Sequence, residues 1–102
     1  MKKKQPRTVL EIENTVSLFK IFSDLTRLRI LDLLVQREYS VLEIAETLDA
    51  SQSAISHQLK MLRDLNVVKT RKDGKQIFYS LKDKHIKELY LVGFEHANKC
   101  LD

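Results

Sequence analysis

The chain has 102 residues, of which 43% are hydrophobic, and its formal net charge is +4 at pH 7 with the histidines neutral. This length predicts one small domain, and the positive charge favours an acidic partner, most commonly nucleic acid. Because no apolar run approaches the ~20 residues that span a bilayer, and none follows the basic start MKKKQPR, we expect neither a membrane span nor a secretory signal.

The N-terminal third predicts a basic tail and two helices. Residues 1–7 form the tail, and residues 8–102 form the folded domain. Apolar residues recur at helical spacing over about residues 8–22 and again over residues 25–36, LTRLRILDLLVQ, where they circle most of the helix. A helix that is apolar nearly all round is buried, so we expect this second helix to be the central one.

Residues 41–65, VLEIAETLDASQSAISHQLKMLRDL, predict two short amphipathic helices joined by a tight turn. Ser51 is placed to cap the second of them, whose inward positions are apolar. Its outward positions are short and polar, namely Gln52, Ser53, Ser56 and His57. Such side chains can hydrogen-bond to base edges in a DNA major groove without holding the backbone away. The alternative is an ordinary helical hairpin in an α-rich domain.

A β-hairpin is predicted after these helices. The β-prone residues 67–71 and 76–81 flank an Asp-Gly turn at residues 72–74. A basic hairpin directly after a helix-turn-helix is typical of a wing, and cations there suit the phosphate backbone or the minor groove. Lys69 adds to this basic character, and the cations expected to bind DNA are Lys60 on the preceding helix and, in the hairpin, Arg71, Lys72 and Lys75.

The last segment, from residue 82 to about residue 99, predicts a long helix with Asp83 placed to cap its start. Its apolar surface exceeds what a terminal helix of a small domain needs, which indicates packing against a second copy with help from the first helix. The expected fold class is mainly α (α+β). We expect a winged helix-turn-helix of order α-α-α-α-β-β-α that forms a homodimer through its first and last helices.

From about residue 16 to residue 98 the sequence resembles the ArsR/SmtB family of bacterial metal-responsive transcriptional repressors. The most specific matches are SDLTRLRIL, SQSAISHQLKMLRDLNVV and GKQIFYSL. The resemblance implies a homodimer that binds double-stranded operator DNA and leaves it when a metal binds, with positions 52, 53, 56 and 57 reading the bases. An enzyme is not expected, because no nucleophile, base and orienting group stand together in the pattern.

The resemblance implies two places for a metal. A Cys-x-Cys pair marks the family's site at the start of the helix-turn-helix; Ser40 and Leu42 stand at the matching positions and offer no thiolate, so arsenic, cadmium or lead sensing there is not expected. The site on the last helix is marked by Asp-x-His, ten residues, and then His-x-x-His or His-x-x-Glu. The matching metal ligands here are Asp83, His85 and His96. Lys99 occupies the fourth position and cannot ligate when protonated, which leaves that position to Cys100, Glu95 or water.

Helix geometry constrains this second site. Residues 85 and 96 lie ~16 Å apart along one helix, so they cannot share an ion within one chain. If two copies of the helix pack antiparallel across a twofold axis, Asp83 and His85 of one copy meet His96 of the other. This donor set suits Zn²⁺ as the effector, with Co²⁺ or Ni²⁺ as alternatives.

A second hypothesis keeps the DNA-binding repressor but takes the metal site as degenerate, with Asp83 only a helix cap. The signal would then be oxidation of Cys100 or a protein partner. Cys100 is the single cysteine, which excludes an intrachain disulfide framework and agrees with a cytoplasmic protein. The operator, the regulated genes and the choice of metal do not follow from the sequence.

Overall fold

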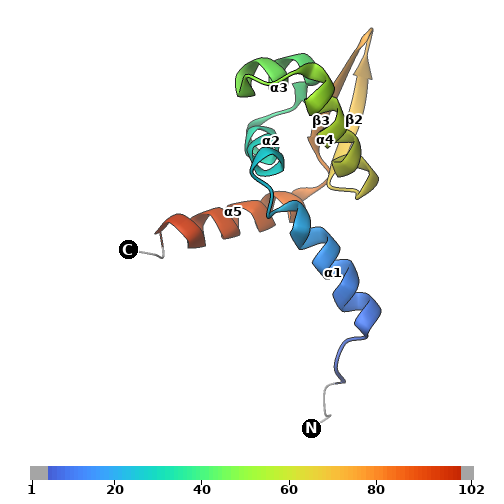
Figure 1. The fold of residues 1–102 in the computed structure, drawn as a ribbon, viewed down its shortest axis with the longest axis vertical. Coiled ribbons are helices and arrows are strands. Elements are labelled where there is room, and N and C mark those ends of the chain that lie inside the picture. The colour runs from blue at the N-terminus through green and yellow to red at the C-terminus, as the bar shows by residue number, and fades with distance from the viewer. Residues whose placement is uncertain (1–4, 100–102) are drawn as a thin grey trace.

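The computed structural model describes residues 5–99 of the chain. Its elements in order are α1 (Val9–Ile21), α2 (Leu25–Gln36), β1 (Tyr39–Ser40), α3 (Val41–Leu48), α4 (Gln52–Asp64), β2 (Val68–Asp73), β3 (Gln76–Leu81) and α5 (Lys84–Lys99). Figure 1 shows that α2, α3, α4 and the sheet lie together, and we call this unit the head. From it α1 and α5 project in different directions, so that the start of α1 and the end of α5 lie away from the head.

Side-chain caps define where the helices begin. At α1, the Thr8 hydroxyl accepts from the Glu11 N–H at 3.1 Å, and the Glu11 carboxylate accepts from the Thr8 N–H at 2.8 Å. This reciprocal pair is a capping box, which satisfies two backbone donors that the helix itself leaves open. Asp24 caps α2 and Ser51 caps α4 in the simpler one-sided way. The prediction that Ser51 caps the second helix of the pair is thus confirmed.

The hydrophobic core lies inside the head. Its fully buried side chains include Ile30, Leu31, Ile44, Ile55, Leu59, Leu62 and Val67. The helix α2 contributes four buried residues, in agreement with its prediction as the central helix, whereas α1 buries only Ile21. Among residues 5–99 no helix is long and apolar enough to cross a bilayer.

The sheet has three antiparallel strands in the order β1-β3-β2. Strands β2 and β3 form the predicted hairpin, and Gly74 at its turn has a φ of +62°, the left-handed region that glycine adopts without steric cost. The mainly α winged helix-turn-helix is confirmed, but the expected order α-α-α-α-β-β-α lacks β1. Tyr39 pairs with Tyr79 and Ser40 with Phe78 of β3. A strand of two residues has no visible period, so only its distant partner reveals it.

Candidate DNA interface and candidate metal centre

The start of α4 presents an exposed polar face. The predicted contacts on this helix are all exposed: Gln52, Ser53, Ser56, His57 and Lys60. Its opposite face packs Ile55, Leu59 and Leu62 completely into the core. The Ser51 hydroxyl accepts from the Ala54 N–H at 3.1 Å and holds the first turn. The polar side chains therefore project from a helix whose orientation is fixed by its own buried face.

The helix α2 also holds α4 through a polar contact. The Arg27 Nε donates to the Gln58 Oε1 at 2.9 Å, and the same guanidinium lies 3.7 Å from the Met61 sulfur. Nothing in the neighbouring sequence distinguishes Arg27 from a solvated arginine. Its partner lies 31 positions away on another helix, and only the fold brings the two together.

A groove lies between the start of α4 and the wing. Its volume is about 420 Å³, and Gln52 and Ser56 of α4 line it together with Lys75 at the wing. Ile77 and Tyr79 of β3 form part of the same wall. The structure thus brings residues from the two predicted DNA-contacting regions to one concave surface.

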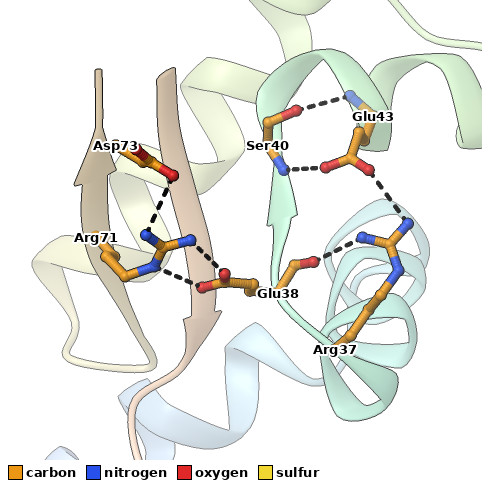
Figure 2. A network of polar contacts seen from close by, with 6 residues as sticks. All are labelled: Arg37, Glu38, Ser40, Glu43, Arg71 and Asp73. Atoms are coloured by element: carbon orange, nitrogen blue, oxygen red, sulfur yellow. Dashed lines mark hydrogen bonds and ion pairs between the residues drawn. The ribbon is translucent and has the colours of Figure 1, made fainter. Parts of the chain in front are cut away.

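Arg71 differs from the other wing cations. Its guanidinium donates to both carboxylate oxygens of Glu38, at 3.2 Å and 2.5 Å, and lies 3.6 Å from the Asp73 carboxylate (Figure 2). The hydrogen bonds between them lower the pKa of Glu38 and raise the pKa of Arg71. Lys72 and Lys75 are exposed like Arg71 and lie nearer the turn end of the hairpin. The Arg71 side chain, predicted to contact DNA, is instead paired with two carboxylates of its own chain.

Glu38 belongs to the short segment that joins α2 to α3. Arg37 donates to the Glu38 carbonyl at 2.8 Å and pairs with the Glu43 carboxylate at 3.2 Å. Ser40 and Glu43 form a second capping box, at 3.0 Å and 3.2 Å, and the backbone hydrogen bond from Ser40 lowers the pKa of Glu43. The spacing Ser-x-x-Glu is a recognised start signal for helices, and it would have located this cap in the sequence.

A buried tyrosine attaches α5 to the head. Tyr90 is 8% exposed, and its hydroxyl donates to the Asp32 carboxylate of α2 at 2.7 Å. Burial, together with this hydrogen bond, raises the pKa of Tyr90 to about 12. The phenol therefore stays neutral and keeps donating to Asp32 throughout the physiological range.

The predicted metal ligands lie at the two ends of α5 and are exposed. Asp83 caps the helix as predicted, because its Oδ1 accepts from the backbone N–H groups of His85 at 2.9 Å and Ile86 at 3.2 Å. The same oxygen lies 3.8 Å from the His85 Nδ1. Within residues 5–99 of a single chain, no three His, Cys, Asp or Glu side chains gather to hold a metal. The structure thus brings Asp83 and His85 together and leaves His96 apart.

Glu95 and Cys100 are the two residues predicted as possible ligands at the fourth coordination position. Glu95 is exposed on α5, next to His96. Cys100, whose thiol is predicted either to bind the metal or to be oxidised, lies outside the described residues.

The helices α1 and α5 leave large apolar side chains exposed. They are Val9, Leu10, Ile12, Val16 and Phe19 on α1, and Leu91, Val92 and Phe94 on α5. Phe19 is 53% exposed and Phe94 is 50% exposed, and both line a pocket of about 350 Å³ between the two helices. Contiguous apolar surface of this kind marks an interaction site.

A helix-turn-helix with an exposed polar second helix, followed by a basic hairpin, defines the winged helix-turn-helix class of DNA-binding proteins. The family model for "Bacterial regulatory protein, arsR family" matches residues 24–70. The chain is 35% identical to the transcriptional repressor SmtB homolog of Synechocystis sp. over 89 residues, which cover 87% of this chain and 67% of that protein. The chain therefore belongs to the ArsR family of bacterial transcriptional regulators, as the resemblance predicted.

Two further comparisons agree with this assignment. The chain is 36% identical to the cadmium resistance transcriptional regulatory protein CadC homolog of Staphylococcus aureus over 87 residues, which cover 84% of this chain and 72% of that protein. The homodimeric winged helix-turn-helix DNA-binding domain of Mb0332 from Mycobacterium bovis has a TM-score of 0.87 and 24% identity, over 100% of this chain and 94% of that chain. The second likeness supports the fold. Membership of a family of regulators also confirms that the chain is not an enzyme.

Proposed function

We propose that this protein is a homodimeric repressor that binds operator DNA through α4 and the wing and is released by a transition metal, Zn²⁺ first. The observation that carries DNA binding is the exposed polar face at the start of α4 beside the groove shared with Lys75. Gln52 suits the major-groove edge of adenine, because its side-chain amide can donate to N7 and accept from the N6 amino group at the same time. Ser53, Ser56 and His57 complete the reading face.

Phosphate contacts come from lysines around this face. Lys60 lies further along α4, and Lys72 and Lys75 lie at the turn end of the hairpin, all three exposed. Contacts of this type add affinity without sequence reading, and each one displaces counterions from the DNA. Binding that depends on them weakens as the salt concentration rises.

The partner in the dimer is a second copy packed on α1 and α5. Large apolar side chains of these helices are exposed in one chain, and two of them, Phe19 and Phe94, line the pocket between the helices. The Mb0332 domain, which shares this fold, is itself homodimeric. A dimer would present two copies of α4 to two half-sites, so the geometry of the interface sets how well both heads fit the DNA.

The donor set on α5 fits a transition metal. The backbone N–H groups of His85 and Ile86 both donate to the Oδ1 atom of the Asp83 carboxylate. The side chains of His85 and His96 are both exposed. Two imidazoles and a carboxylate are ligands that Zn²⁺, Co²⁺ and Ni²⁺ accept. An ion held by these residues would cross-link the last helices of the two copies. Since Lys99 offers no ligand when protonated, the fourth position would fall to Glu95, Cys100 or water.

The alternative signal, oxidation of Cys100 or a protein partner, applies if the α5 residues serve only structure. The cap made by Asp83 favours it, because the cap alone explains an aspartate at this position. In that case His85 and His96 would be exposed side chains of the interface without a ligand.

Fluorescence anisotropy of a labelled duplex, selected by the protein from a randomised library, tests both halves of the proposal. Gln52→Ala and Ser56→Ala should each weaken binding to the selected duplex by about fivefold or more, on the order of 1–3 kcal/mol per lost base contact. Unchanged affinity in both would refute DNA reading by α4.

Titration of Zn²⁺ into the complex tests the metal. Zn²⁺ should release the duplex from the wild type and from Glu88→Gln, which alters a carboxylate of α5 outside the proposed set. It should not release the duplex from His85→Ala or His96→Ala. Equal response of all four proteins, or no response in any, would refute the metal site, and an oxidant then tests Cys100.

A further inference from the structure

Arg71 and Glu38 meet on the face of the sheet opposite the groove. Successive side chains of a strand point to opposite faces. Ile77 and Tyr79 of β3 line the groove beside α4, whereas Phe78 between them pairs with Arg71 of β2. The Arg71 guanidinium lies 4.9 Å from the Phe78 ring centre. In Figure 2 the Arg71 side chain crosses β3 to reach Glu38 on the far side of that strand.

The contact ties three parts of the head together. Glu38 directly precedes β1, and its neighbours Arg37 and Ser40 both contact Glu43 of α3. Arg71 lies in the middle of β2, ahead of the exposed turn that carries Lys75. One end of the contact is thus anchored at the start of the helix-turn-helix, and the other end belongs to the wing.

We propose that Glu38 and Arg71 form a clasp that positions the wing relative to α3 and α4, and that Arg71 contributes to DNA binding by this route and not as a phosphate contact. A bidentate arginine–carboxylate pair fixes the relative orientation of the two side chains as well as their distance, because the planar guanidinium and carboxylate are joined by two parallel hydrogen bonds. The clasp sets where Lys72 and Lys75 lie beside the start of α4. The part of this inference that concerns DNA rests on the proposed function.

The clasp and the phosphate-contact interpretation make opposite predictions for Glu38→Gln. If Arg71 contacts phosphate, removal of the competing carboxylate frees the guanidinium and strengthens binding. If the pair is a clasp, Glu38→Gln and Arg71→Gln weaken binding alike, by about two- to fivefold for an exposed ion pair. The double variant should then be no weaker than either single one, since the pair acts as a unit.

Arg71→Lys separates charge from geometry. A lysine keeps the positive charge for a phosphate but cannot replace the two-pronged fork. The clasp therefore predicts that Arg71→Lys loses affinity like Arg71→Gln. The charge-swapped pair Glu38→Arg with Arg71→Glu restores affinity, because the contact is remade with its ends exchanged.

The experiment measures each variant in two ways. Without DNA, ¹⁵N relaxation of residues 72–76 should show increased motion in Glu38→Gln and Arg71→Gln, and recovery in the charge-swapped pair. With the selected duplex, the salt dependence of affinity should be altered to the same extent in Glu38→Gln and Arg71→Gln, because both release the same wing lysines. A direct phosphate contact by Arg71 would instead reduce the salt dependence in Arg71→Gln alone, by the equivalent of about one phosphate contact, as in the control Lys75→Gln.

Unchanged wing motion, stronger binding by Glu38→Gln, or a salt dependence that is smaller in Arg71→Gln than in Glu38→Gln would each overturn the clasp. If the wild type binds no selected duplex, the proposed function fails, while the relaxation measurement still decides whether the pair orders the wing.

Discussion

Tyr90 offers the sharpest test of how α5 is attached to the head. In Tyr90→Phe the ring remains and only the hydroxyl is lost, so no cavity opens and the effect reports the hydrogen bond to Asp32. That bond is 2.7 Å long and its acceptor is a carboxylate that is only partly buried. Hydrogen bonds to charged groups contribute about 1.5–3 kcal/mol, and water can partly replace the donor at Asp32, so we expect a loss of about 1.5 kcal/mol.

Urea unfolding followed by circular dichroism measures this loss. A decrease of about 1.5 kcal/mol corresponds to a midpoint lower by about 1 M for a domain of this size. All samples must have one protein concentration, because the proposed association of two copies would contribute to the measured stability. Tyr39→Phe is the matched control: Tyr39 is 7% exposed, close to the 8% of Tyr90, and within residues 5–99 its hydroxyl makes no side-chain hydrogen bond. Equal midpoints for the two variants would refute the reasoning.

The same pair of residues predicts a pH dependence. The folded state holds the pKa of Tyr90 at about 12, above the ordinary tyrosine value of about 10. The contribution of the neutral phenol to stability is therefore complete below pH about 10 and is lost as the pH rises toward 12. The difference between the wild type and Tyr90→Phe should narrow over this window, and a constant difference would contradict the raised pKa.

Three other variants test the remaining parts of the molecule. If two copies associate as proposed, Phe94→Glu should sediment as a monomer in sedimentation velocity, because it puts a charge into the apolar face of α5; Leu42→Glu, at a residue of matching exposure (47% against 50%) in the groove beside the wing, should sediment as the proposed dimer. Ser40→Ala should lower the unfolding free energy by about 1 kcal/mol through loss of the α3 cap, and an unchanged thermal midpoint would argue against the capping box. Lys75→Gln should reduce the salt dependence of DNA binding by about one phosphate contact, and an unaltered dependence would remove this lysine from the interface.

Much of the head was predictable from local pattern. The alternation of buried and exposed positions in α4, with Ser51 before it, specifies both the helix and the face that it turns to solvent, because periodicity and capping are properties of adjacent residues. The hairpin follows in the same way from β-prone runs around Gly74. The cap at Asp83 is equally local, since the acceptor and its donors in His85 and Ile86 lie within one turn.

The sequence alone determined that the chain carries a helix with one apolar and one polar face, a basic wing and a long last helix with surplus apolar residues, since each of these follows from neighbouring residues. Only the tertiary structure decided which charges are already engaged. Arg71 and Lys75 are both cations of one hairpin, yet Arg71 is bound by Glu38 from 33 positions away and Lys75 lines the groove. Tyr90 and Asp32 lie 58 positions apart in the sequence, and the fold joins them by a hydrogen bond. Such contacts depend on how the chain folds back on itself, and no short pattern of residues encodes the distance between two side chains that are remote in sequence.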